Sequence, residues 1–215
     1  MKKESTELVF ILDRSGSMHG MEKDVVGGFN AMIEKQKHEP GKAYVSTILF
    51  DDRTEVLHDR LSVRNVQPIT ERDYFVRGST ALLDAIGGAI HHIGNIHKYA
   101  RPEDVPAHTI FVVNTDGMEN ASVRYTAPEV KSMIERQKEK YGWEFLFLGA
   151  NIDAVGTAGR LGIDPSRAAN YRCDSRGIRL NYEAMARAVS SIRGDENLSS
   201  SWKEDVEEDV RRRGR

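Results

Sequence analysis

The amino-acid sequence predicts an α/β fold: a doubly wound, Rossmann-like, mainly parallel six-stranded sheet with one antiparallel edge strand and helices on both faces. Two observations lead to this prediction. Short apolar runs, several rich in Val, Ile and Phe, alternate with stretches whose apolar residues recur at helical spacing. Two of the runs are separated by a polar triplet that is too short to hold a helix. Alternating strands and helices build a parallel sheet covered on both sides.

The strands come first, because they define the sheet. Four apolar runs are expected to form its buried strands, at residues 8–12, 43–50, 109–113 and 144–148. A further strand at 54–57 follows the triplet 51–53 and should run antiparallel at the edge. Asp51 and Asp52 are interpreted as turn formers rather than as a catalytic pair. A last short strand is expected at 168–171.

Helices are expected in most of the intervals between these strands. A short one is placed at 154–161, and Gly194 is expected to end the last one. The other helices are recognised by an apolar face, formed by Val25, Phe29, Met32 and Ile33, by Leu82, Leu83, Ile86, Ile90 and Ile93, by Val130, Met133 and Ile134, and by Tyr182, Met185, Val189 and Ile192.

The composition changes after Gly194, so we predict one domain over residues 1–194 and a linker with a short amphipathic helix or tail over 195–215. Ser201 and Glu204 are expected to form a capping box. Trp202, Val206 and Val210 recur at every fourth residue, as on one helical face. We expect this helix to fold back on the domain, while docking to a partner is the alternative.

Composition and charge exclude several functions. The 31 basic and 33 acidic residues nearly cancel, so no overall field favours nucleic acid or an anionic membrane. The start of the chain lacks a signal peptide, and no apolar stretch is long enough to span a bilayer. The single cysteine, Cys173, is expected to be a small core residue and excludes an intramolecular disulfide. A soluble cytoplasmic protein is therefore expected.

Oxygen-bearing side chains cluster where strands are expected to end. In an open parallel sheet, ligands bind at the carboxyl ends of the strands. Carboxylates and hydroxyls without imidazole or thiolate suit Mg²⁺ or Mn²⁺ rather than zinc or copper. These side chains are Asp13, Ser15 and Ser17 after the first apolar run, Thr80 just before a helix, and Asp116 after the run 109–113.

This set, Asp-x-Ser-x-Ser followed by a distant Thr and a Thr-Asp-Gly, resembles the von Willebrand factor type A (VWA) domain family. The stretches Gly-Ser-Thr-Ala-Leu-Leu-Asp-Ala-Ile at 78–86 and Thr-Asp-Gly-Met-Glu-Asn at 115–120 are similar to those of bacterial, intracellular members. The resemblance spans residues 7 to about 193. It implies that the five side chains form an intact metal-ion-dependent adhesion site.

The resemblance also implies a function without catalysis. Family members typically hold the serines, and often the threonine, directly on the metal and the aspartates largely through water. An exposed Asp or Glu of a protein partner then fills the free coordination position. The chain would thus be a divalent-metal-dependent module for protein–protein interaction. The competing hypothesis is an Mg²⁺-dependent phosphohydrolase of the haloacid dehalogenase type, which is disfavoured because Ser15 stands where that mechanism needs a second acid.

Other residues near these motifs receive structural interpretations. Arg14 and Met18 are expected to point outward, and His19 to face solvent. Glu119 and Asn120 could shape the rim of the site or cap the following helix, and the sequence does not decide between these roles. The histidines of the second helix lack the spacing of a zinc site and are expected to be partly exposed: His91, His92 and His97.

Overall fold

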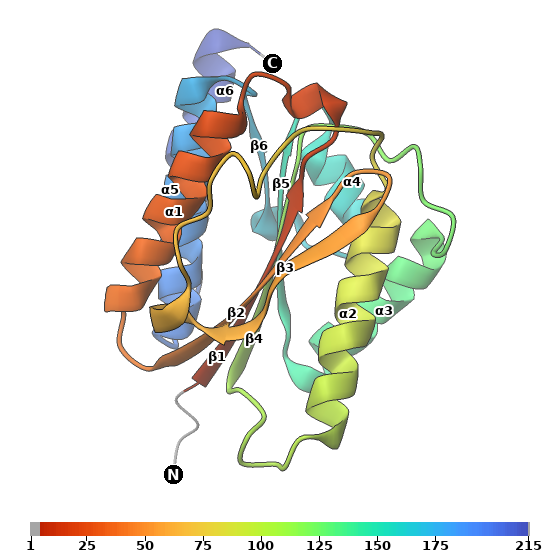
Figure 1. Cartoon of the computed structure of the whole chain (residues 1–215), viewed down its shortest axis with the longest axis vertical. Helices are drawn as coiled ribbons and strands as arrows, with labels where there is room; N and C mark the ends of the chain where they lie inside the picture. Colours follow the sequence, from red (N-terminus) through yellow and green to blue (C-terminus); the bar gives the residue numbers. More distant parts are fainter. Residues whose placement is uncertain (1–4, 215) are drawn as a thin grey trace.

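The computed structural model describes residues 5–214 and confirms the predicted fold class (Figure 1). The sheet has six strands in the order β3-β2-β1-β4-β5-β6. Neighbouring strands are parallel except at one edge, where β3 runs antiparallel to β2. The strands are β1 (Ser5–Asp13), β2 (Lys42–Phe50), β3 (Thr54–Ser62), β4 (His108–Thr115), β5 (Glu144–Ala150) and β6 (Ala168–Tyr171).

Helices cover both faces of the sheet, with α1 and α5 on one side and α2, α3 and α4 on the other (Figure 1). Alternate side chains of a strand point to opposite faces. Leu8 and Phe10 of β1 illustrate this on the α1–α5 side, whereas Val9 and Ile11 pack on the other side. The helices are α1 (Glu22–His38), α2 (Leu82–Tyr99), α3 (Ala127–Tyr141), α4 (Ala154–Arg160), α5 (Ser175–Arg193) and α6 (Glu204–Arg213).

The edge strand β3 is longer than predicted. It was expected to end at residue 57 and instead continues to Ser62. Its second half, His-Asp-Arg-Leu-Ser, carries no β-branched residue and so gave no strand signal. The pairing with β2 is irregular around Thr47, and Arg60 adopts a left-handed φ of 49°. An edge strand tolerates such an irregularity because only one neighbour constrains it.

The C-terminal segment packs against β6 and α5. A 3₁₀ turn, Ser200–Lys203, precedes α6 and buries Trp202, whose Nε1 donates to the Ser166 carbonyl at 3.0 Å. The predicted capping box is wrong: the Ser201 hydroxyl lies 2.5 Å from that of Ser199, and no side chain caps α6. The anchored tryptophan fixes the turn before the helix can begin. The domain boundary at residue 194 stays a prediction.

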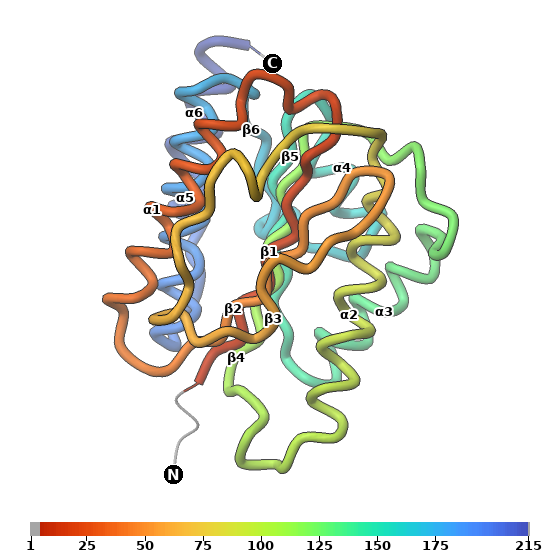
Figure 2. Tube along the Cα trace, in the orientation of Figure 1, coloured from red at the N-terminus to blue at the C-terminus, as the bar shows by residue number. Residues whose placement is uncertain are grey.

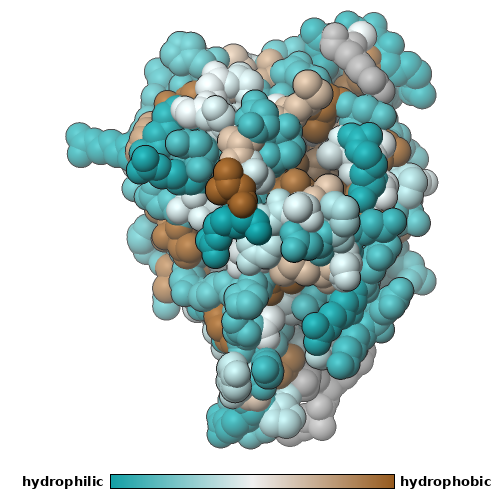
Figure 3. Space-filling model, turned by 90° about the vertical axis from the view of Figure 1, so that its right-hand side faces the viewer, coloured by the Kyte–Doolittle hydropathy of each residue, from teal (hydrophilic) through white to brown (hydrophobic). Residues whose placement is uncertain are grey.

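The face of the molecule that carries α2 and α3 is mainly polar (Figure 3). On the side that carries α2 and α3, hydrophobic residues form separate spots among hydrophilic ones (Figure 3). Among residues 5–214, no helix combines the length and the apolar character that crossing a bilayer requires.

Candidate metal centre

The five candidate ligands lie in three loops that meet at one end of the sheet (Figure 2). β1 and β4 are adjacent and parallel, with Leu12 opposite Asn114, so the loops that follow them lie side by side. The loop before α2 reaches the same place, since Gly16 N donates to the Gly78 carbonyl at 3.1 Å. Residues far apart in the sequence are thereby brought together, as the topology of a parallel sheet predicts.

Hydrogen bonds link four of the five residues. Ser17 Oγ donates to Asp116 Oδ1 at 2.5 Å, and the hydroxyls of Ser15 and Ser17 are 3.1 Å apart. Asp13 Oδ1 accepts from the Ser15 N–H at 2.7 Å. Asp13 Oδ2 accepts from Thr115 Oγ1 at 2.5 Å. Thr115 is a residue that sequence reasoning missed, and its contact fixes the Asp13 carboxylate.

The fifth side chain, Thr80, faces the same space across Gly117. A Cβ built on Gly117 would lie 2.9 Å from Thr80 Oγ1 and 3.4 Å from Ser17 Oγ. It would lie 3.8 Å from Ser15 Oγ. Three hydroxyls therefore surround Gly117, and any side chain at this position would crowd them. Glycine is needed here for the close approach and not for a left-handed φ.

The two aspartates are buried, where negative charge is energetically costly. Asp13 and Asp116 are each 1% exposed, and neither has an ion-pair partner among residues 5–214. Burial raises the pKa of Asp116 to about 6; the Ser17 hydrogen bond opposes this shift and the charge of Asp13 adds to it. Burial also raises the pKa of Asp13, against hydrogen bonds from Thr115 and Ser15. A bound cation would offset the cost of two buried negative charges.

Glu119 and Asn120 brace the loop that carries Thr80. Asn120 Oδ1 accepts from the Thr80 N–H at 2.9 Å, and the Asn120 N–H donates to the Thr80 carbonyl at 3.0 Å. Glu119 Oε2 accepts from the Leu83 N–H at 2.9 Å, at the start of α2. The role as a cap of the following helix is therefore wrong, because Thr126 and Glu129 form the capping box of α3.

Arg14 and Met18 are buried, which corrects the expectation that they point outward. Arg14 is 0% exposed, and its Nε donates to Asp51 Oδ2 at 2.8 Å. Arg77 Nε donates to the same oxygen at 2.8 Å. Met18 is 1% exposed and belongs to the core on the α1–α5 side. Asp51 forms its turn as predicted but also acts as a buried counter-ion.

This arrangement connects the loops of the centre. Arg14 lies next to Ser15, and its carbonyl accepts from the Arg77 N–H at 2.9 Å. The Asp51 carbonyl accepts from the Ala81 N–H at 2.8 Å, beside Thr80. Asp51 thus joins the β2–β3 turn to two of the loops that carry candidate ligands. No local pattern in the sequence indicates these contacts, because Arg77 and Arg14 lie 26 and 37 residues from Asp51.

Tyr74 and Cys173 complete the surroundings of the aspartates. Tyr74 is fully buried, and its hydroxyl donates to the Asp13 carbonyl at 2.5 Å. Cys173 packs against the core, as expected of a core-facing residue, but it is only half-buried and its Sγ lies beside the site, 3.6 Å from Asp116 Oδ2. Burial raises the pKa of this thiol to about 12, so it is protonated at neutral pH. A protonated thiol is a poor nucleophile.

The histidines do not contribute to this centre. His19 is exposed, as predicted, with its Nδ1 3.7 Å from Glu22 Oε1. His91 and His92 are exposed on α2, whereas the side chain of His97 is only 9% exposed. Within the described part of the chain, no three His, Cys, Asp or Glu side chains are grouped so as to hold a metal ion.

No protein-family model matches the sequence, and no curated protein sequence matches it. Several solved structures, however, are similar to this chain in fold. The von Willebrand factor type A protein from Catenulispora acidiphila gives a TM-score of 0.59 at 12% identity, over 88% of this chain and 43% of that chain. Proximal thread matrix protein 1 from the mussel byssus, solved with a zinc-occupied MIDAS motif, gives 0.59 at 14% identity, over 87% and 46%. Manganese-loaded TRAP protein from Plasmodium vivax gives 0.57 at 16%, over 84% and 73%.

The chain spans less than half the length of the mussel and Catenulispora proteins. Sequence identities of 12–16% show similarity of fold alone. The order and direction of the strands and the helices on both faces agree with this similarity. The chain therefore has the Rossmann-like fold of a von Willebrand factor type A domain.

Proposed function

We propose that the chain binds a divalent cation, Mg²⁺ or Mn²⁺, and through it a carboxylate of a protein partner. The ligands would be Asp13, Ser15, Ser17, Thr80 and Asp116. The observation that carries this proposal is the convergence of three hydroxyls on two buried carboxylates that lack an ion-pair partner among residues 5–214.

The donor set fits a hard cation. All five side chains offer oxygen, which Mg²⁺ and Mn²⁺ prefer, and none offers the imidazole or thiolate that selects zinc or copper. The half-buried Cys173 is close to Asp116, but its thiol is protonated and does not compete as a ligand. When bound, such a cation supplies a Lewis-acidic centre to which an outside carboxylate can coordinate.

A protein partner is favoured over other classes of ligand. The net charge of −2 gives no general attraction to nucleic acid or to an anionic membrane. The mussel protein, whose fold is similar, was solved with a zinc-occupied MIDAS motif. We extend this to an exposed Asp or Glu of a partner and to an intracellular, cytoplasmic setting of the kind that the sequence motifs resemble.

The phosphohydrolase hypothesis gains little from the geometry. Both oxygens of Asp13 are engaged, by the Ser15 N–H and by the Thr115 hydroxyl. A nucleophilic carboxylate would need one of them free to attack phosphorus. Ser15 provides a hydroxyl where that mechanism requires an acid.

Metal binding is tested by isothermal titration calorimetry with Mg²⁺ and with Mn²⁺. Asp116→Asn keeps the shape of the side chain and should weaken binding by about tenfold or more, the range seen when groups at a metal site are changed. Asp52→Asn, at an exposed position in a neighbouring turn, is the matched control and should bind like the wild type. Unchanged affinity in Asp116→Asn would remove Asp116 from the site.

Partner binding is tested separately, by capture from native lysate with Mg²⁺, with EDTA, and with the Asp116→Asn variant. A protein retained only by the wild type in Mg²⁺ is then purified, and its acidic contact residue is changed to the amide. Loss of binding in that variant supports carboxylate coordination. Capture that is the same with EDTA and with Asp116→Asn as in Mg²⁺ contradicts carboxylate coordination. If Thr80→Ala binds the partner as tightly as the wild type, Thr80 is not a ligand of the metal.

A further inference from the structure

A cavity lies at the end of the sheet opposite to the candidate metal centre. It has a volume of about 790 Å³ and lies between α2 and α3, above the segment that connects α2 to β4. Thr109 near the start of β4 and Trp143 just before β5 contribute to its wall. A volume of this size is within the ~300–1,000 Å³ typical of small-molecule sites.

The wall is mainly apolar and aromatic. Trp143 lies with one face against Phe111 at a centroid distance of 5.2 Å, and it borders the cavity together with Tyr125, Tyr141 and Met133. Rings held in fixed positions by the core offer a planar ligand surfaces for stacking and edge-to-face contact. A flexible thioether beside them adapts to the outline of such a ligand.

The charges of this cavity are all of one sign. Lys98 and Arg136 border it, and no acidic side chain does. Neither cation has an ion-pair partner among residues 5–214; Lys98 instead lies over the Tyr99 ring, 5.1 Å from its centroid. Uncompensated cations beside a largely apolar wall favour an anionic ligand, because a guanidinium pairs with carboxylate, sulfonate or phosphate oxygens.

His97 supports the aromatic wall of the cavity. Its ring packs edge-on against Trp143, with 5.5 Å between the ring centroids, and its side chain is only 9% exposed. Its Nε2 lies 3.6 Å from Glu7 Oε2, within ion-pair distance. The histidine thus helps to hold Trp143 in place.

Gly94 keeps the cavity open. It lies in the interior of α2, where glycine costs about 0.5–1 kcal/mol relative to alanine. Its φ is not in the left-handed region, and an added Cβ would meet only ordinary contacts, 3.7 Å from Gln137 Nε2 and 3.9 Å from Trp143 Cη2. Nothing in the fold itself therefore requires glycine, whereas a larger side chain would extend between the wall residues.

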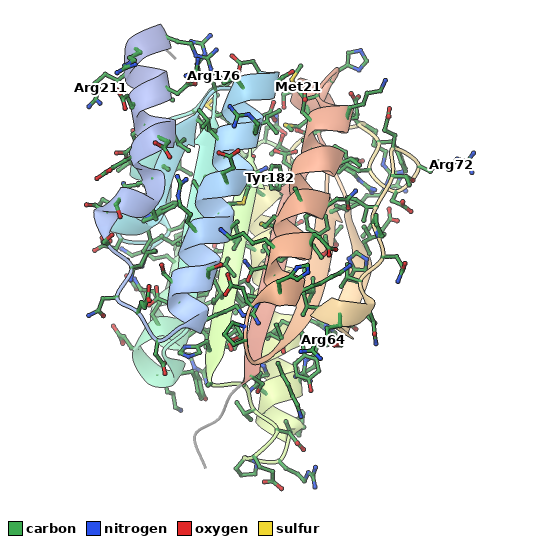
Figure 4. The ribbon with its side chains drawn as sticks, turned by 90° about the vertical axis from the view of Figure 1, so that its left-hand side faces the viewer. Met21, Arg64, Arg72, Arg176, Tyr182 and Arg211 are labelled. Carbon is green, nitrogen blue, oxygen red and sulfur yellow. The ribbon has the colours of Figure 1, made fainter. Side chains whose placement is uncertain are left out.

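Another large cavity of the described structure is different in character. It has a volume of about 830 Å³ and lies between α1 and α5, where Tyr182 packs against Gly28 (Figure 4). Its arginines are already compensated: Arg176 pairs with Asp209 at 3.0 Å, and Arg179 pairs with Glu183 at 2.8 Å. Lys23 and Lys35 also border this groove, but so do the acidic Asp24 and Glu183. Its charges are therefore of both signs, unlike those of the cavity between α2 and α3.

We propose that the cavity between α2 and α3 binds a small planar aromatic anion. The ring system would lie against Trp143 and beside Gly94, and the anionic group would pair with Arg136 and Lys98 at the rim. This inference does not depend on the function proposed for the metal centre, since the two places are at opposite ends of the sheet. A ligand here could be present with or without a divalent cation.

The test uses two probes of matched shape in fluorescence titrations of the full chain. Anilinonaphthalene sulfonate is an aromatic anion, and phenylnaphthylamine is its counterpart without the sulfonate. The chain has two tryptophans, so Trp202→Phe leaves Trp143 as the only energy donor to a bound probe. We expect energy transfer from Trp143 and about tenfold tighter binding of the anion, as one charge-assisted hydrogen bond provides.

Two pairs of variants decide the outcome. Gly94→Leu should abolish binding of both probes, whereas Gly27→Leu, a helical glycine of α1 with no neighbour within 4 Å of an added Cβ, should not. Lys98→Gln with Arg136→Gln should remove the preference for the anion. Lys23→Gln with Arg72→Gln removes the same amount of positive charge away from this cavity and should preserve the preference for the anion. Equal affinity for the two probes, or anion binding unchanged in either cavity variant, overturns the proposal.

Discussion

Replacing Asp51 by alanine should destabilise the protein strongly, although this residue lies in a turn. Its carboxylate is 0% exposed and accepts hydrogen bonds from Arg14 and Arg77 at 2.8 Å each. Without it, the ion pair left to the buried Arg14 guanidinium among residues 5–214 is with Glu55, whose side chain is 50% exposed and 2.8 Å away; the guanidinium also lies 5.0 Å from the centroid of the Phe75 ring. Breaking a buried pair costs about 3–5 kcal/mol, and the remaining contact places Asp51→Ala near 3 kcal/mol. For a chain of this size that lowers Tm by about 6–12 °C.

The assay is urea unfolding followed by circular dichroism, with Asp52→Ala as the matched control. Asp52 is half exposed in the same turn, so its replacement should change the free energy of unfolding by about 0.5 kcal/mol at most. Adding Arg14→Met to Asp51→Ala removes the orphaned charge and should recover part of the loss. A cost below about 1 kcal/mol for Asp51→Ala, or no recovery in the double variant, would refute the reasoning.

The hydrogen bonds of Asp51 also lead to a prediction for how stability depends on pH. Burial alone would raise the pKa of Asp51, but hydrogen bonds, of which that from Arg77 has the largest effect, outweigh it and lower the pKa below its ordinary value of 3.8. A group whose pKa is lowered by folding stabilises the protein above its unfolded pKa and loses that contribution as the pH falls through the folded value. The difference between wild type and Asp51→Ala should therefore be constant near neutrality and shrink below pH 3.8.

Four further predictions concern the metal centre and the C-terminal segment. Affinity for Mn²⁺ should fall by about tenfold per pH unit below 6, because a proton competes with the metal for Asp116. Calorimetry at several pH values checks this, and an affinity that stays constant from pH 7 to 5 contradicts it. Without metal, the raised pKa of Asp116 should instead make the protein more stable as the pH falls from 6 towards 3.8, which thermal unfolding in EDTA measures. Gly117→Ala places a Cβ 2.9 Å from Thr80 Oγ1 and should weaken divalent binding, whereas Gly88→Ala, with no neighbour within 4 Å, should leave affinity unchanged. Trp202→Ala should cost about 3–5 kcal/mol in urea unfolding because the ring is 3% exposed; a loss below about 1 kcal/mol would show that α6 contributes little to the fold.

The sheet and the candidate ligands could be predicted because their signals are local. An apolar run such as Leu8–Leu12 shows the strand, and the oxygen-bearing residues follow it directly in the chain. The parallel topology then places the ends of β1 and β4 together without any knowledge of side-chain contacts. Burial of Asp13 and Asp116 follows from the same positions.

The errors arose where a distant residue decides the conformation. Arg14 was expected in solvent because arginine is rarely buried, and only Asp51, 37 residues later, reverses this preference. Ser201 has the spacing of a capping box, yet the hydrogen bond from Trp202 to Ser166 fixes a different turn. Cys173 carries no local signal that its thiol lies beside Asp116. Such contacts depend on the packing of the whole chain.

The position of α6 has a consequence for self-association. β6 is a short edge strand of four residues, and an unprotected sheet edge invites pairing with strands of other molecules. Lys203 Nζ donates to the main-chain carbonyl of Ala168 at 2.7 Å, and α6 packs against β6. The C-terminal segment thus covers this edge of the sheet and limits its pairing with other molecules. Removing residues 199–214 should expose this edge and increase self-association, which light scattering measures.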